Sequence, residues 1–217
     1  ILRTLPEDYE RLTYLQGDGK SYFLTDYMPH PKTDTVIFDF ELRKPDTVTG
    51  LLCSREAGMN KSWSFCGMTG PNFRFDISWD QIQFWAPGMV PGMRFAVKMQ
   101  NGTVTLSDGI SATSKNNPLS LDESGGPMMM MAYYNNSTSL TATSFSFDRV
   151  YGCQVSRSGA LLHDWVPVRT PNGVVTLYDR VTGDDLEPKG TGAFIAGPAW
   201  TCEGPFIPPH ATILIVR

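Results

Sequence analysis

The sequence predicts an all-β fold, a two-sheet antiparallel β-sandwich, and three features of the chain support this. Apolar and polar residues alternate in many short segments, and a period of two is typical of strands with one buried face. No stretch of about ten residues keeps the three- and four-residue apolar spacing of a helix. Twenty glycines and sixteen prolines are spread along the 217 residues, as many tight turns require.

The first half of the chain contains four predicted strand segments. They are residues 35–42, 72–79, 81–85 and 93–109. In the first segment Phe38 and Phe40 point to one face and Asp39 points to the other, so one face packs on a core. The last segment has Asn101-Gly102 between two alternating runs. Both residues tolerate the positive φ of a type I′ turn, which predicts a hairpin.

The second half continues this pattern to the end of the chain. Its predicted strands are residues 128–134, 145–159, 160–168 and 173–183, with a last one at residues 212–216. The apolar run MMMMAYY at 128–134 predicts a strand buried on both faces. A methionine-lined binding groove is the alternative there, because methionine adapts to irregular surfaces. No linker, composition shift or internal repeat divides the chain, so we expect one domain over residues 1–217.

Charge and hydropathy argue against three classes of protein. The net charge is −4, the sequence pI is about 5.3, and no lysine–arginine cluster is present, whereas nucleic-acid binders need a basic surface. No apolar run approaches the roughly 18 residues of a membrane-spanning helix, so we expect no transmembrane segment in this chain. A hydrophobic fraction of 41% with only 18% charged residues argues against disorder.

The four cysteines predict no zinc site. Cys53, Cys66, Cys153 and Cys202 form no Cys-x-x-Cys pair and have no histidine nearby. Two interpretations stay open. The cysteines are buried free thiols that pack as small hydrophobic side chains, or Cys53 and Cys66 close a short loop with a disulfide.

The segment 150–197 carries the most distinctive pattern, with VYGCQVSRSG, then LLHDWVPVR, then VVTLYDRVTG and GTGAFIAG. It resembles the closing part of concanavalin A-like, laminin-G-like jelly-roll domains of surface and phage-related proteins in gut bacteria. The opening YERLTYLQGDGKSYFLTDY is similar to the start of the same group, so the resemblance covers most of residues 5–197. Residues 198–217 lie beyond that pattern and form either an extra strand or a C-terminal extension.

The resemblance implies a non-catalytic binding or adhesion module, extracellular or at the cell surface, that recognises carbohydrate. Sugar sites combine aromatic ring faces with polar side chains that bond hydroxyl groups. The candidate ligand-binding residues are Trp63, Trp85, Tyr133, Tyr134 and Asn135. For each aromatic residue, packing in the core or a hairpin is the alternative. The expected partner is a glycan or a surface protein, and the oligomeric state stays open.

Catalysis is not expected, and no catalytic residue is assigned. The chain has no Gly-x-Ser-x-Gly motif, and His163 and Asp164 are consecutive on a strand and so point to opposite faces. Glycoside hydrolysis needs two carboxylates a few ångströms apart. Asp39 and Glu41 share a face, but it is the outward one, where we expect solvated carboxylates. A jelly-roll glycoside hydrolase acting on a polysaccharide is the alternative function, and a structural spacer in a larger surface protein is the third.

No cofactor is expected, although a structural calcium ion is compatible with a lectin-like sandwich. Calcium sites use aspartate, asparagine and backbone oxygens in rim loops, and Asp18 and Asp26 are the candidates. We interpret Asp184-Asp185 as a turn. No EF-hand loop or dense aspartate cluster occurs, so the sequence assigns no metal ligands.

Overall fold

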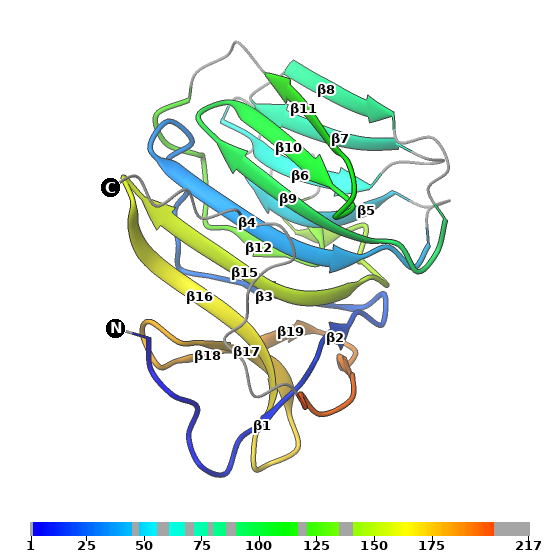
Figure 1. The fold of residues 1–217 in the computed structure, drawn as a ribbon, viewed down its shortest axis with the longest axis vertical. Coiled ribbons are helices and arrows are strands. Elements are labelled where there is room, and N and C mark those ends of the chain that lie inside the picture. Colours follow the sequence, from blue (N-terminus) through cyan, green and yellow to red (C-terminus); the bar gives the residue numbers. More distant parts are fainter. Residues whose placement is uncertain are drawn as a thin grey trace.

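The structure, a computed structural model, describes residues 2–44, 48–55, 61–67, 72–77, 80–85, 90–116, 121–134 and 141–201, with the backbone alone for 80–85. All regular secondary structure in this part of the chain is β-strand. The strands form two stacked antiparallel sheets, which confirms the predicted sandwich; Figure 1 shows β4 and β15 of one sheet in front of β5 and β12 of the other. None of these residues forms a helix that could span a membrane.

The larger sheet combines strands from the first, middle and last parts of the described chain. Its strands, in spatial order, are β11 (Ala112–Asn116), β10 (Thr103–Ser107), β9 (Arg94–Gln100), β4 (Asp34–Glu41), β15 (Arg149–Arg157), β16 (Ala160–Arg169), β17 (Val175–Asp179) and β18 (Asp185–Leu186). Three short strands extend it: β1 (Glu10–Arg11) pairs with β16, and β2 (Leu15–Gln16) pairs with β15 and with β20 (Ile195–Ala196).

The second sheet lies against the first. Its order is β19 (Pro188–Gly190), β3 (Ser21–Leu24), β12 (Met129–Met130), β5 (Thr49–Ser54), β6 (Trp63–Gly67), β7 (Asn72–Ile77) and β8 (Asp80–Trp85). A separate two-stranded ladder joins β13 (Tyr133–Tyr134) to β14 (Ala142–Thr143).

Aromatic rings join the two sheets in the core. Phe40 of β4 contacts Phe65 of β6 and Phe73 of β7, with ring centroids 6.1 and 5.7 Å apart. Phe95 of the neighbouring β9 lies 5.8 Å from Phe40. All four rings are buried, and each contributes about 1.5–3 kcal/mol by leaving water. The alternation predicted for residues 35–42 is therefore confirmed on its inward face.

The hairpin predicted at Asn101-Gly102 is also confirmed. Both residues have a positive φ, 46° and 73°, and they connect β9 to β10 with Gln100 paired to Thr103.

The methionine run is buried as predicted, but it is not one strand. Residues 128–134 are all buried, and the chain leaves the second sheet after β12 because Met131 adopts a φ of 68°. It then forms β13, which pairs with β14. Gly50 makes this bend fit: a Cβ at that position would overlap the backbone of Ala132 and Tyr133.

Cys53, Cys66 and Cys153 are buried and none of the three forms a disulfide, so the disulfide alternative for Cys53 and Cys66 is wrong. Burial raises the pKa of both Cys53 and Cys66 to about 12, which makes them unreactive thiols in the folded state. Cys202 and the strand predicted at 212–216 lie outside the described residues.

Candidate functional site

The predicted sugar-binding residues do not gather at one surface. Trp63 is only 2% exposed and belongs to the main core together with Phe65. Residues 63 and 65 share the inward face of β6, so the indole packs between the sheets and offers no ring face to a ligand. The ligand-binding role predicted for Trp63 is therefore wrong, and the packing alternative holds.

Tyr133 and Tyr134 are also buried, on the outer side of the second sheet in a small cluster with Cys53 and Cys66. The Tyr133 hydroxyl donates to Asp76 Oδ2 at 2.8 Å, and the Tyr134 hydroxyl donates to the carbonyl of Pro127 at 3.1 Å. Both polar groups are therefore engaged inside the protein.

The side chain of Trp85 and the whole of Asn135 lie outside the described residues, so their proposed roles stay predictions. The backbone of Trp85 lies in the edge strand β8, where its register partner is Asn72.

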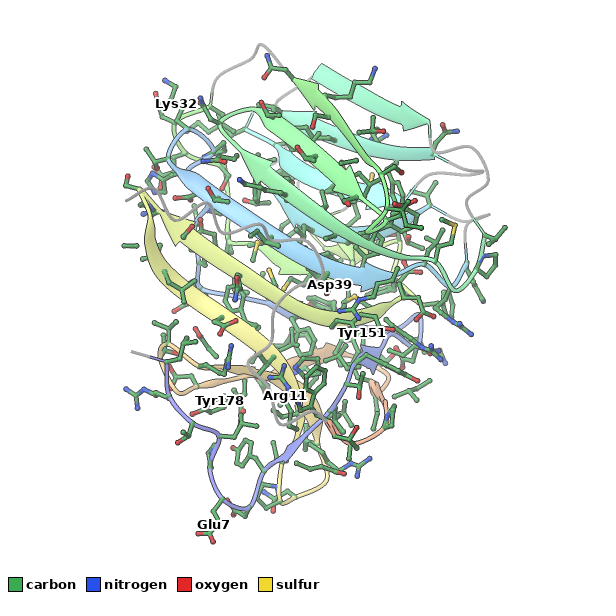
Figure 2. The ribbon with its side chains drawn as sticks, in the orientation of Figure 1. Glu7, Arg11, Lys32, Asp39, Tyr151 and Tyr178 are labelled. Atoms are coloured by element: carbon green, nitrogen blue, oxygen red, sulfur yellow. The ribbon has the colours of Figure 1, made fainter. Side chains whose placement is uncertain are left out.

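A different set of residues forms a site on the outer face of the larger sheet. We call it the arginine cluster. It comprises Tyr14, Asp39, Glu41, Arg43, Arg94, Arg149 and Tyr151. The strands place these side chains together, because β4 lies between β9 and β15 and Glu41 is the register partner of both Arg94 and Arg149. Figure 2 labels Asp39 and Tyr151 over the middle of this sheet.

Arg94 is fixed by three contacts. Its Nε donates to Asp39 Oδ1 at 2.8 Å, and its Nη2 donates to Asp39 Oδ2. Two parallel hydrogen bonds of this kind make a bidentate pair, which restricts the orientation of the guanidinium. The guanidinium carbon also lies 3.8 Å from the centre of the Tyr151 ring, a cation–π distance. Arg94 still keeps 36% of its side chain exposed, so one edge of the guanidinium faces solvent.

Glu41 ties the rest of the cluster together. Its Oε2 accepts a hydrogen bond from the Tyr151 hydroxyl at 2.6 Å, and its Oε1 accepts from Arg149 at 2.9 Å and from Arg43 at 3.0 Å. Arg149 in turn lies over the ring of Tyr14, 4.2 Å from its centre.

The electrostatics of this face differ from the expectation. Asp39 and Glu41 do share the outward face, but they are 3% and 7% exposed, so the prediction of solvated carboxylates is wrong. Arginines from neighbouring strands cover them. Burial raises the pKa of Asp39 against the opposing effect of Arg94. Burial would also raise the pKa of Glu41, but hydrogen bonds from Tyr151 and Arg43 and the charge of Arg149 lower it. Three arginines and two carboxylates leave the cluster with one net positive charge.

A pocket of about 290 Å³ opens beside Arg94. Its lining residues are Asp39, Arg94, Phe95, Ala96, Ser107, Asp108, Gly109 and Ile110. The wall is the turn that joins β10 to β11, where the Asp108 carboxylate accepts the backbone N–H groups of Ile110 at 2.9 Å and Ser111 at 2.8 Å. This turn projects Ile110, whose side chain is 97% exposed, at the rim. The pocket thus combines a fixed cation, carboxylate and hydroxyl oxygens and an apolar edge.

The sequence did not reveal the arginine cluster, because its members come from four separate segments. The only signal available was the shared outward face of Asp39 and Glu41. Arg94 and Arg149 join them only through strand register, which one sequence does not specify.

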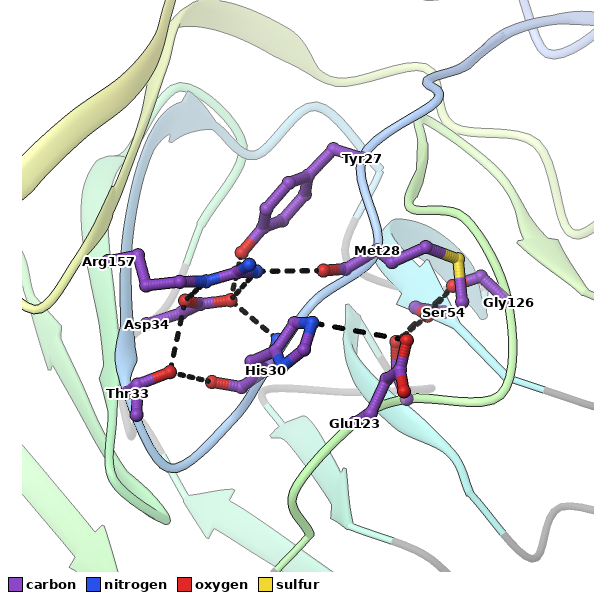
Figure 3. Close-up of polar contacts among 10 residues, drawn as sticks. Tyr27, Met28, His30, Thr33, Asp34, Ser54, Glu123, Gly126 and Arg157 are labelled. Atoms are coloured by element: carbon purple, nitrogen blue, oxygen red, sulfur yellow. Dashed lines mark hydrogen bonds and ion pairs between the residues drawn. The ribbon is translucent and has the colours of Figure 1, made fainter.

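A second polar network at one end of the sandwich has a structural role (Figure 3). Asp34 accepts hydrogen bonds from the Tyr27 hydroxyl, from the His30 amide and from Arg157, whose Nε lies 2.7 Å from Asp34 Oδ1. Arg157 also donates to the carbonyl of Met28 at 3.1 Å. These bonds join the segment before β4 to the end of β15.

His163 has a different carboxylate partner from its neighbour in sequence. Its Nδ1 lies 2.6 Å from Asp179 Oδ2, and its ring stacks on Trp165, whereas Asp164 pairs with Arg180. Among the described residues, no serine or cysteine partner of His163 is found that could act as a nucleophile beside this pair.

The calcium candidate Asp18 has another role in the structure. Its carboxylate accepts three backbone N–H groups, from Lys20 and Ser21 at 2.8 Å and from Ala193 at 2.9 Å. Burial would raise the pKa of Asp18, but these amides lower it. Within the described residues, no group of three or more histidine, cysteine, aspartate or glutamate side chains is placed to hold a metal ion.

The sequence matches no protein-family model and no curated protein. In fold the chain is similar to domains LG4-5 of the mouse laminin α1 chain, with a TM-score of 0.50 and 14% identity over 90% of this chain and 47% of the laminin chain. The chain thus spans about half the length of that structure.

Two further solved structures are similar. The CBM40 of the Ruminococcus gnavus IT-sialidase bound to α2,6 sialyllactose has a TM-score of 0.50 and 11% identity, over 71% of this chain and 93% of that one. The heptameric SAP-like pentraxin of Limulus polyphemus has a TM-score of 0.52 and 13% identity, over 90% and 97%. The fold is therefore the concanavalin A-like jelly roll that the sequence resemblance implied.

Proposed function

We propose that this protein is a non-catalytic carbohydrate-binding module that holds a glycan in the pocket beside Arg94. The observation that carries the proposal is the partly exposed side chain of Arg94, whose guanidinium is fixed by Asp39 and Tyr151 at the edge of a 290 Å³ pocket. Sugars carry adjacent hydroxyl groups, and a planar guanidinium beside carboxylate and hydroxyl oxygens can donate to and accept from them. Because these groups are held before a ligand arrives, binding costs little side-chain entropy.

The same contacts favour binding over hydrolysis. A glycoside hydrolase needs one carboxyl group that gives up its proton and a second that acts as base or nucleophile. Both oxygens of Asp39 accept from Arg94, and both oxygens of Glu41 accept from tyrosine or arginine donors. The two carboxylates therefore position arginines. The alternative function is a glycoside hydrolase, and a polysaccharide degradation assay tests for it.

The proposed setting is extracellular or at a cell surface, with a glycan or a surface protein as partner. Support comes from the sequence resemblance to bacterial surface proteins and from a neighbour of the same fold that was solved with sialyllactose. A structural spacer without a ligand is the competing interpretation, and binding measurements separate the two.

A glycan-array screen followed by titration calorimetry tests the proposal. We expect Arg94→Ala to weaken binding of any glycan found by about tenfold or more, because a charged hydrogen-bond donor contributes about 1.5–3 kcal/mol. Arg169→Ala is the matched control, because Arg169 also pairs with a carboxylate, Glu10, but does not line this pocket. Equal affinities in wild type and Arg94→Ala would exclude this site, and the absence of any bound glycan would support the spacer.

A further inference from the structure

A second and larger pocket lies on the same sheet, at its β17 end. It has a volume of about 530 Å³ and forms where the N-terminal segment crosses the β16–β17 turn and β18. Its lining residues come from these three segments and their immediate neighbours in the chain. None of them lines the pocket beside Arg94. Figure 2 labels Tyr178, whose ring contacts Tyr9 of this pocket, away from Asp39 and Tyr151.

Tyr9 gives this pocket a fixed aromatic wall. Its ring packs edge-on against Tyr178, with centroids 5.8 Å apart at 64°. Its hydroxyl donates to Asp185 Oδ2 at 2.6 Å. That hydrogen bond, with burial and the charge of Asp185, raises the pKa of Tyr9 to about 12, so the phenol stays a donor at neutral pH. One oxygen of Asp185 is thereby oriented, and no partner of its other oxygen is found among the described residues.

The residues that line this pocket are of three chemical kinds. Val174, which is exposed, and Leu186 contribute apolar patches, together with two prolines. Thr170 and Asn172 contribute hydroxyl and amide groups. Asp8, Asp185 and Glu187 contribute carboxylates, and in the part of the chain that the structure describes no lysine or arginine lines the pocket.

Lys189 pairs with Glu187 from outside the pocket, and no basic partner of Asp8 or Asp185 is found among the described residues. A carboxylated ligand would be repelled here, whereas an ammonium group would be attracted.

We infer that this pocket binds a sugar that carries a free, protonated amine. Its volume falls in the roughly 300–1,000 Å³ range of small-molecule sites. The Tyr9 ring and the apolar lining suit the apolar face of a sugar, the threonine and asparagine groups suit its hydroxyls, and the carboxylates suit its ammonium group. This site shares no lining residue with the proposed glycan site and, within the described chain, has no arginine like Arg94 at its edge, so either site can exist without the other.

Titration of the intact chain with the β1,4-linked tetramer of glucosamine tests the inference at pH 6 and low salt. The fully N-acetylated tetramer has the same rings without the charge, and we expect it to bind about tenfold or more weakly. Asp185→Asn should weaken binding of the glucosamine tetramer by about tenfold, and Asp8→Asn, at an exposed residue, supplies a second variant if Asp185→Asn does not fold.

Asp122→Asn is the matched control. It removes one carboxylate charge from a residue that is exposed, pairs with Lys32 and lies outside the pocket. If Asp122→Asn and Arg94→Ala keep wild-type affinity while Asp185→Asn loses it, the ammonium group of the sugar binds in the pocket lined by Tyr9. Absence of binding, equal affinity for the acetylated tetramer, or loss of binding only in Arg94→Ala would overturn the inference. Equal binding of a lysine-rich peptide would also overturn it, because the pocket would then recognise an amine without a sugar.

Discussion

Asp39 shows how one side chain can differ from what its position in a strand suggests. Alternation correctly placed it opposite Phe38 and beside Glu41, yet it is buried because Arg94 of the next strand covers it. The same alternation would have put Trp63 on the face of Phe65, and the polar neighbours of Trp63 in sequence were the misleading signal. Local sequence therefore predicts the face of a residue well, whereas its exposure depends on residues distant in sequence.

Removing the Asp39 carboxylate tests how much its bidentate pair with Arg94 contributes to stability. We expect Asp39→Asn to lower the free energy of unfolding by about 1–3 kcal/mol, because a half-buried guanidinium loses one charged acceptor. The comparison is Glu10→Gln in the exposed Arg169–Glu10 pair, which should cost below about 1 kcal/mol. Urea unfolding of both variants measures the difference, and equal losses would show that burial does not strengthen the Asp39 pair.

At the scale of elements, most predicted strands formed, and the exception has an identifiable cause. The run at residues 128–134 was predicted as one strand because its composition is uniformly apolar. The structure bends it at Met131, so that β12 completes the second sheet and β13 pairs with β14. The space for this bend comes from Gly50, about eighty residues earlier, and a local pattern has no access to such a contact.

The dependence on Gly50 gives a direct prediction. A Cβ on residue 50 would overlap the backbone of Ala132 and Tyr133, which cannot rotate away as a side chain can. We expect Gly50→Ala to cost about 3 kcal/mol or more in unfolding free energy. Gly92→Ala is the control, because its Cβ meets nothing within 4 Å and only its positive φ, 93°, costs about 1 kcal/mol. Similar midpoints for the two variants in thermal or urea unfolding would rule out the close contact.

For the whole molecule, composition and alternation are enough to predict two stacked antiparallel sheets. The motif at 150–197 predicts that the sandwich is a concanavalin A-like jelly roll. The pockets were beyond reach of the sequence, since each needs distant segments to meet. Asp8 and Asp185, for example, line one pocket from opposite ends of the chain. Strand order and register determine which distant segments lie side by side, and both follow from packing of the complete core.

The three buried thiols report on the integrity of that packing. Cys153 lies in the main core, and Cys53 and Cys66 lie in the smaller cluster beneath β13. In a Cys202→Ser background we expect Ellman's reagent at pH 8 to react with no thiol in native protein and with three in urea. Burial blocks the reagent and raises the pKa of Cys53 and Cys66 to about 12, which leaves almost no thiolate.

Single-cysteine variants then separate local from global opening. Cys53 and Cys66 need only the β13–β14 ladder to lift, whereas Cys153 needs the two sheets to part, so its labelling rate should be the slowest and should follow the unfolding free energy. Fast labelling of Cys153 in native protein would mean that the two sheets do not enclose it. Fewer than three reactive thiols in urea would mean that a disulfide forms after all.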